Sequence, residues 1–362
     1  TGDVDLLAKH GRVAGYIGRL RDGTKTICCY SRSMCRLLWT CLVLQACTSS
    51  GAAPAPLLPE FSPPNPIHSG ELPKRAAGES FRFLIGGHLY GDSSGTVSPA
   101  ATFTAACPSL AAADVDLMIC CGDTFRFSTQ AAFDQVAAQL GPLPFPVFNA
   151  VGNHDVAIRS AYEARFGATY GAFVHAGCAF VLLDTELRPW EIEGDQLAFL
   201  RRALSEAGHD SEIRAVFCFG HKLVHCHRQR YFEVLVGSNA LDGLGGPNRF
   251  VRDVLPLLAD VAKHKPVYWC GGDIGLSHTL HAMVDRDPES GVTFMATGIG
   301  DLPRDALLQV EVAGDTVSVR MRSLTGAPMS DVTDKGLAKW RERFFPAGLS
   351  PQLRALRAIL PK

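Results

Sequence analysis

Five short segments of the chain place side chains that can bind metal ions directly after glycine residues. These segments are Gly86-Gly87-His88, Gly122-Asp123, Gly152-Asn153-His154-Asp155, Gly220-His221 and Gly272-Asp273. Carboxylate, amide and imidazole groups together form a mixed oxygen and nitrogen ligand set, which suits Mn, Fe or Zn. Because glycine lets the backbone turn sharply, each of these side chains can point into one shared space. The pattern predicts a divalent metal site without choosing among the three metals.

Each of these segments follows an apolar run with the length and composition of a buried β-strand. Six such runs occupy residues 81–85, 115–121, 146–151, 179–183, 215–219 and 266–270, and the fourth run ends at Asp184. Residues 196–204 repeat apolar side chains with a helical period. Short buried strands that alternate with helices predict an α/β domain. In open α/β sheets, sites form outside the carboxyl ends of the strands, so we expect the polar side chains to meet there.

In order and spacing, these residues resemble the calcineurin-like metallophosphoesterases over about residues 80–322. The family runs Asp-x-His, Gly-Asp, Gly-Asn-His-Asp/Glu, Gly-His and Gly-His-x-His, each after a strand. Residues 183–221 are similar to the branch related to purple acid phosphatases, and the block at 152–155 is the most specific element. The resemblance implies a four-layer α/β/β/α sandwich. It also implies a hydrolase that acts on phosphate mono- or diesters.

The resemblance also implies how the ligands divide between two metal positions. Asp123 would be the carboxylate that bridges both ions. One position would use four side chains that can all bind a metal, namely Asp123, Asn153, His221 and Asp273. We therefore expect this ligand set to hold a divalent ion.

The other metal position is depleted. Gly86 and Gly275 stand where the family has Asp and His, which leaves His88 and the shared Asp123. We therefore expect one tightly held ion per chain, with His88 as a weak ligand. Alternative ligands for the depleted position are Asp92, His278 and His281.

The chemistry of phosphate esters explains the remaining candidates. Two metal ions about 3.5–4 Å apart can clamp the attacking and leaving oxygens, and a bound ion makes water a better nucleophile. By the same resemblance, His154 would contact the phosphate and protonate the leaving group, while Asp155 would orient its imidazole. His225 and His227 follow the fourth motif and are candidates for the substrate-binding rim, with a plain surface loop as the alternative.

Two functions of different classes follow from these residues. The first is a metallophosphoesterase whose activity is weakened by the loss of one metal position. The alternative is a binding protein on a phosphoesterase scaffold whose site no longer turns over. Gly86 and Gly275 favour the alternative, whereas the intact block at 152–155 favours an enzyme, because a binder has no evident need for an acid.

The N-terminal part has the organisation of an exported lipoprotein. Residues 34–47 combine a basic start, an apolar run and the lipobox-like ending Leu-Gln-Ala-Cys, so Cys47 is expected to carry a lipid. Residues 48–77 are rich in proline and small residues and are expected to form an extended tether. Residues 1–33 are expected to lie upstream of the true start. This order predicts a lipid-anchored protein of the bacterial cell envelope.

Composition sets further limits on the protein's class. The 362 residues are 47% hydrophobic and 20% charged, which is too apolar for a disordered chain. The formal net charge of −1 provides no bulk attraction to nucleic acid, and no nucleic-acid-binding patch is evident.

We expect the phosphoesterase domain over residues 78–325 and a basic, helical tail over 326–362. We expect most cysteines of the domain to be reduced and buried.

Overall fold

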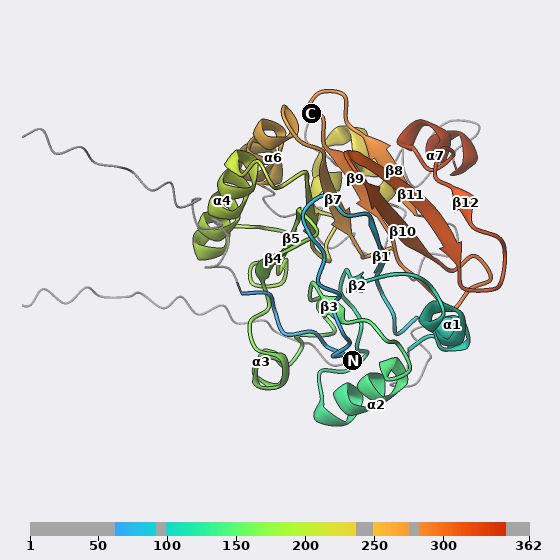
Figure 1. The fold of residues 1–362 in the computed structure, drawn as a ribbon. Helices are drawn as coiled ribbons and strands as arrows, with labels where there is room; N and C mark the ends of the chain where they lie inside the picture. The colour runs from blue at the N-terminus through green and yellow to red at the C-terminus, as the bar shows by residue number, and fades with distance from the viewer. Residues whose placement is uncertain (1–61, 92–98, 237–248, 275–281, 345–362) are drawn as a thin grey trace, which may run out of the picture. The chain divides into compact units, whose positions relative to one another are not determined.

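The computed structural model describes residues 62–91, 99–236, 249–274 and 282–344. In this part of the chain, strands form two six-stranded sheets (Figure 1). The first sheet has the order β12 (Ser330–Asp331), β11 (Thr316–Ser323), β10 (Ala306–Ala313), β1 (Phe81–Gly86), β2 (Leu117–Cys120), β3 (Val147–Asn149). The second has the order β4 (Gly171–His175), β5 (Cys178–Leu182), β6 (Ala215–Phe219), β7 (Val267–Gly271), β9 (Thr293–Ala296), β8 (Met283–Arg286).

The centre of each sheet is parallel. In the first sheet β1, β2 and β3 run in the same direction, and β10 pairs antiparallel to β1. In the second sheet β5, β6, β7 and β9 are parallel, with β4 and β8 antiparallel at the edges. The loops that follow β1, β2 and β3 therefore leave the same edge of the first sheet, as do those after β5, β6 and β7 in the second.

Helices cover the outer faces of the two sheets, and apolar side chains fill the space between the sheets. The helices are α1 (Ala101–Ala111), α2 (Gln130–Leu140), α3 (Arg159–Phe166), α4 (Gly194–His209), α5 (Phe232–Val236), α6 (Leu255–Ala262) and α7 (Leu337–Phe344). Along β1, Leu84 joins the cluster that α1, α2 and α3 complete, while Phe83 faces the second sheet. The Phe83 ring lies 5.1 Å from the rings of both Phe180 and Phe217. On the far side of the second sheet, Leu200 of α4 and Leu258 of α6 pack with the strands.

This arrangement is the four-layer α/β/β/α sandwich that the sequence predicted. The six expected strands are all present with ends shifted by a few residues, and the predicted helix at 196–204 lies within α4. The sequence did not predict β4 or the strands β8 to β12. The seven cysteines of the described residues are unpaired and buried, as expected: Cys107, Cys120, Cys121, Cys178, Cys218, Cys226 and Cys270.

Residues 62–77 differ from the extended tether that the sequence predicted for 48–77. Ile67 is buried, and its N–H donates to the Val147 carbonyl of β3 at 2.8 Å. Arg75 forms a two-pronged ion pair with the buried Asp116, whose carboxylate also contacts His175 Nε2 at 2.7 Å. Since Asp116 precedes β2 and His175 ends β4, this cluster joins the N-terminal segment to both sheets. The apolar Ile67 and the paired Arg75 explain why this stretch is held on the domain despite its prolines.

Several predicted features lie outside the described residues. These are residues 1–33, the signal segment 34–47 with Cys47, the first part of the tether, and residues 345–362 of the expected helical tail. Among the residues that are described, no helix has the length and apolar character required to cross a membrane.

Candidate metal centre

The predicted ligands lie on loops at the carboxyl ends of the central strands. His88 follows β1, Asp123 follows β2, and Asp273 follows β7. Backbone hydrogen bonds hold these loops together in pairs. The His88 N–H donates to the Gly122 carbonyl at 2.8 Å, and the Gly272 N–H donates to the His221 carbonyl at 2.8 Å. The loops are therefore positioned by the sheets and by each other.

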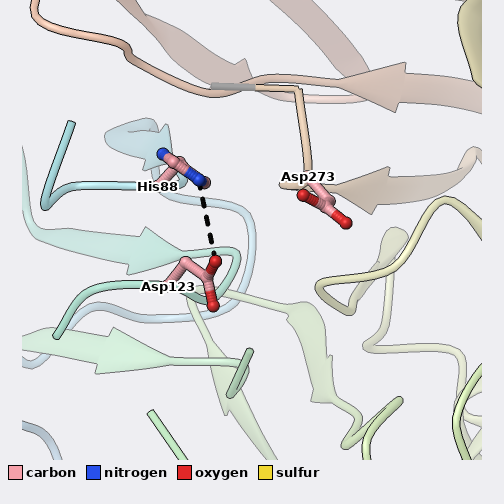
Figure 2. Close-up of side chains that lie close together, drawn as sticks. All are labelled: His88, Asp123 and Asp273. Atoms are coloured by element: carbon pink, nitrogen blue, oxygen red, sulfur yellow. Dashed lines mark ion pairs between the residues drawn. The ribbon is translucent and has the colours of Figure 1, made fainter. Parts of the chain in front are cut away.

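Three side chains converge on one point. One ligand atom from each of His88, Asp123 and Asp273 lies within 4.8 Å of the others, and Figure 2 shows the three groups facing a common space. His88 Nε2 is 3.7 Å from Asp123 Oδ2. All three residues are buried. Two buried carboxylates beside an imidazole are the donor set that a divalent transition metal prefers.

His221 completes this group, and its hydrogen bonding tests whether a metal fits. Its Nδ1 lies 2.9 Å from the Cys121 carbonyl, which can only accept, so Nδ1 carries the proton. Its Nε2 then presents a lone pair 3.5 Å from Asp123 Oδ1 and 3.8 Å from Asp273 Oδ1. That nitrogen is buried and has no hydrogen-bond partner. A lone pair that faces two carboxylates is stabilised by a positive charge, which either a proton on Nε2 or a metal ion can provide, so the residues fit a bound metal ion.

The electrostatics of the cluster lead to the same conclusion. Burial opposes a charge on His221, but the carboxylates of Asp123 and Asp273 outweigh it and raise the pKa of this imidazole. Burial would raise the pKa of Asp273, but His221 and Lys222 outweigh it and hold that pKa below its usual range. For His88, burial dominates and lowers the pKa. The site therefore attracts positive charge and keeps His88 in the neutral form that binds metals.

The backbone around the cluster is strained. Asp123 and His88 have φ angles of 54° and 58°, in the left-handed region that few residues other than glycine adopt. Such strain is concentrated at functional sites. Gly152 is required for a different reason, because a Cβ there would lie 2.3 Å from Asp123 Oδ1. The sequence block at 152–155 thus brings the backbone against the Asp123 carboxylate.

The side chain of Asn153 contacts a lysine beside this group. It is exposed, and its Oδ1 accepts a hydrogen bond from Lys222 Nζ at 3.1 Å. Lys222 Nζ also lies 3.3 Å from Asp273 Oδ2. No motif in the sequence pointed to Lys222, although this residue directly follows the Gly-His motif. The sequence pattern also ranked His88 as a weak ligand, whereas the structure groups His88 with Asp123 and Asp273.

His154 lies at the edge of the cluster and is half-buried. Its backbone N–H donates to Asp123 Oδ1 at 3.1 Å, and its Nδ1 lies 3.0 Å from the Arg126 carbonyl. The Tyr90 ring lies between two imidazoles, 4.8 Å from the ring of His154 and 4.3 Å from that of His88. His154 is thus placed beside the candidate ligands without facing the group as a ligand itself.

Asp155 does not orient His154, which corrects the expectation from the sequence. The Asp155 carboxylate is buried and accepts from the Phe125 N–H at 2.9 Å, the Gly152 N–H at 2.8 Å and Asn149 Nδ2 at 3.0 Å. These bonds join the loops after β2 and β3. Burial, and next the charge of Asp123, raises the pKa of Asp155 to about 6. The Arg126 carbonyl, which is close in space but has no sequence signal, fixes the His154 ring instead.

Comparison with known proteins identifies the fold. No protein-family model matches the chain, and no curated protein matches it. Among solved structures, it is similar to purple acid phosphatase PPD1 from yellow lupin (Lupinus luteus) seeds, with a TM-score of 0.51 and 14% identity. This match covers 72% of the present chain and 54%, or about half, of the lupin chain. The chain has the calcineurin-like metallophosphoesterase fold.

Two further structures are similar at lower scores. PhoD has a TM-score of 0.46 and 13% identity, over 72% of this chain and 70% of its own. A single mutant of Vps29 from Entamoeba histolytica has a TM-score of 0.33 and 11% identity, over 69% of this chain and 96% of its own. The fold assignment rests on the lupin enzyme.

Within this metallophosphoesterase fold, the two histidines that the sequence suggested for the substrate-binding rim lie in different surroundings. His225 belongs to a short 3-10 helix, Val224–His227, that turns it into the core. There its ring stacks on Phe294 at 4.9 Å, and burial lowers its pKa to about 3. His227 is partly buried, 5.1 Å from the Trp190 ring, and burial lowers its pKa. His225 is therefore a core residue, and its assignment to substrate binding was wrong.

The loop after β5 contributes a residue that the sequence analysis missed. Burial raises the pKa of Glu186 to about 7, against the opposing charges of Lys222 and His221. This places Glu186 in the electrostatic surroundings of the candidate metal centre. The run Asp-Thr-Glu after the fourth predicted strand was the available signal. Four other positions, Asp92, Gly275, His278 and His281, lie outside the described residues.

Proposed function

We propose that this protein is a metal-dependent hydrolase of phosphate esters that holds one divalent ion per chain. The observation that supports it is the buried His221 Nε2, which faces the carboxylates of Asp123 and Asp273 without a hydrogen-bond partner. With His88, these side chains form a set of two imidazoles and two carboxylates, which suits Zn, Mn or Fe. The lupin enzyme, which is a purple acid phosphatase by name, supports phosphate esters as the substrate class.

The proposed chemistry divides between the ion and the protein. A bound divalent ion supplies Lewis-acid stabilisation of the negative charge on a phosphoryl group. Asp123 and Asp273 hold the ion, and the Cys121 carbonyl fixes the tautomer of His221 that can bind it. The Arg126 carbonyl accepts a hydrogen bond from His154 Nδ1, so Nδ1 carries one proton. In the imidazolium form, Nε2 would carry the second proton and could give it to the leaving-group oxygen. The backbone bond from His154 to Asp123 keeps this acid at a fixed distance from the ligands.

The proposal is tested by metal content and turnover in the same preparation. Elemental analysis of the purified protein should find one Zn, Mn or Fe per chain. The loaded protein should hydrolyse an aryl phosphate monoester or a bis-aryl diester. His154→Ala should lower kcat by about 10²–10⁴-fold while metal content stays unchanged. The exposed His209 on α4 provides the matched control, since His209→Ala should change neither quantity.

Two results would contradict this proposal. A protein without bound metal after reconstitution with each of the three ions would remove its basis. A fully loaded protein that binds phosphate but hydrolyses neither ester would instead support the catalytically impaired binding protein.

We also propose that a lipid on Cys47 anchors the protein in the bacterial cell envelope. The support is the lipobox-like sequence at 44–47, which lies outside the described residues. In a bacterial host, the native chain should incorporate labelled palmitate and fractionate with membranes. Cys47→Ser should abolish both, whereas Cys41→Ser, which alters a cysteine of the same apolar run, should not. Incorporation that persists in Cys47→Ser would exclude this anchor.

A further inference from the structure

We infer that the ammonium group of Lys222 occupies the place of a second metal ion. The centre then contains two positive groups: one metal ion, which can exchange, and the lysine side chain, which is part of the protein. This inference deepens the proposed function and rests on it. The relevant ligand atoms are Asn153 Oδ1 and Asp273 Oδ2, both of which the sequence pattern assigned to a metal ion. Lys222 Nζ contacts them at 3.1 Å and 3.3 Å.

The protein backbone delivers this ammonium group to the centre. Lys222 directly follows His221 in the loop after β6, and its N–H donates to Thr185 Oγ1 at 3.0 Å. The residue is buried, with only 6% of its surface exposed, and its Nζ lies 5.7 Å from the centre of the Trp190 ring. Lysine is almost never buried unless its charge is paired. The position of Lys222 is therefore built into the fold, unlike that of a surface lysine.

Aspartate at position 273 is the chemical counterpart of this lysine. Its Oδ1 faces His221 Nε2 at 3.8 Å, while its Oδ2 faces Lys222 Nζ at 3.3 Å. One carboxylate can thus bind a metal ion with one oxygen and an ammonium group with the other. A neutral imidazole has a single acceptor nitrogen and could not do both. The aspartate that replaces the family's histidine and the neighbouring lysine therefore form a matched pair.

The charges of the site explain why it would not hold a second metal ion in addition to the first ion and the Lys222 ammonium group. The carboxylates around the centre are Asp123 and Asp273, which face His221, and Glu186, which interacts with the charge of Lys222. One divalent ion and the Lys222 ammonium group together balance their three negative charges. A second divalent ion at Asn153 and Asp273 would lie beside the Lys222 ammonium group, where like charges repel strongly in a poorly solvated site. Lys222 therefore limits the centre to one metal ion. It also provides a fixed positive charge near that ion to which a phosphoryl oxygen can bind.

Metal stoichiometry tests the inference without relying on activity. Wild-type protein that has been stripped, equilibrated with Zn²⁺ or Mn²⁺ and desalted should retain one ion. Lys222→Met removes the charge at nearly constant side-chain length, and this variant should retain two ions. Lys222→Arg keeps the charge and should retain one. The matched control is Lys265→Met, because Lys265 is also partly buried but donates to the carbonyls of Ala207 and Asp210, away from the centre.

Calorimetric titration should show the same change as a second binding event that is present in Lys222→Met and absent from wild type and Lys265→Met. If Lys222→Met does not fold in chelator, Lys222→Gln offers a polar replacement with the same expected gain. Two ions in the wild type, or one ion in both neutral variants, would overturn the inference while leaving the proposed function intact. A wild type that binds no ion would instead reject the proposed function.

Discussion

Substitution of His88 and Asn153, one at a time, separates the ligand set in the structure from the one that the sequence suggested. The structure groups His88 with Asp123 and Asp273, and it pairs the Asn153 amide with Lys222. Four-ligand zinc sites bind with about 10–16 kcal/mol in all, or roughly 3 kcal/mol per ligand. Because each 1.4 kcal/mol is about a factor of ten, His88→Ala should weaken metal binding by about 100-fold or more. Asn153→Ala should change it by about threefold or less.

Competition of each stripped variant with a chromogenic chelator gives the dissociation constants directly. Asn153 is exposed, so its replacement does not disturb the core. His88 is buried, and the unfolding transition in chelator should first show that His88→Ala is folded. A large loss of affinity in Asn153→Ala together with a small one in His88→Ala would refute the reasoning from the structure. That result would restore the ligand set with Asn153 that the sequence pattern suggested.

Three further predictions concern the framework of the centre. Gly152→Ala should lower metal affinity at least tenfold, measured by the same competition, because its Cβ would meet Asp123 Oδ1 at 2.3 Å; unchanged affinity would contradict this close approach. In metal-free protein, the contribution of Asp155 to the free energy of unfolding should fall by about 2 kcal/mol as pH rises from about 4 to 7, because its folded pKa of about 6 exceeds its unfolded value and favours the protonated form. Urea unfolding at both pH values should show that Asp155→Asn lacks this component, and an identical slope in the two proteins would exclude it. Arg75→Ala should cost about 1–3 kcal/mol by removing both hydrogen bonds to the buried Asp116, and a loss within the error of the urea midpoints would show that the N-terminal segment is only loosely attached.

The sequence predicted the fold well because its strongest signals are local. Buried parallel strands are nearly continuous apolar runs, and the glycine that follows five of the six runs marks where the chain leaves the sheet. The strands β4 and β8 to β12 were missed because their patterns are weaker. In β11, Val317, Val319 and Met321 alternate with polar residues, which is the period of a half-buried strand. This alternation is a signal from which β11 could have been predicted.

The site was predicted only in part because distance in space is not encoded in spacing alone. The convergence of Asp123 and Asp273 followed from their place at strand ends. The contacts of Lys222 and the burial of His225 depend on how the loop after β6 turns, which no periodicity records. The role of Asp155 was inferred from its position next to His154, yet its carboxylate is held by backbone donors from two loops.

The metal position that the sequence identified as depleted also has a structural explanation. A Cβ at Gly86 would point at the Leu307 and Met118 side chains, 2.9 and 3.0 Å away, on the face of the first sheet that packs against helices. A carboxylate at this position would therefore enter apolar surroundings, where an unpaired charge is costly. Glycine at residue 86 is consequently part of the packing of β1 rather than a simple loss of a ligand. The positive charge of Lys222 lies at the other ligand set, beside Asn153 and Asp273, so it does not replace the carboxylate that is missing at residue 86.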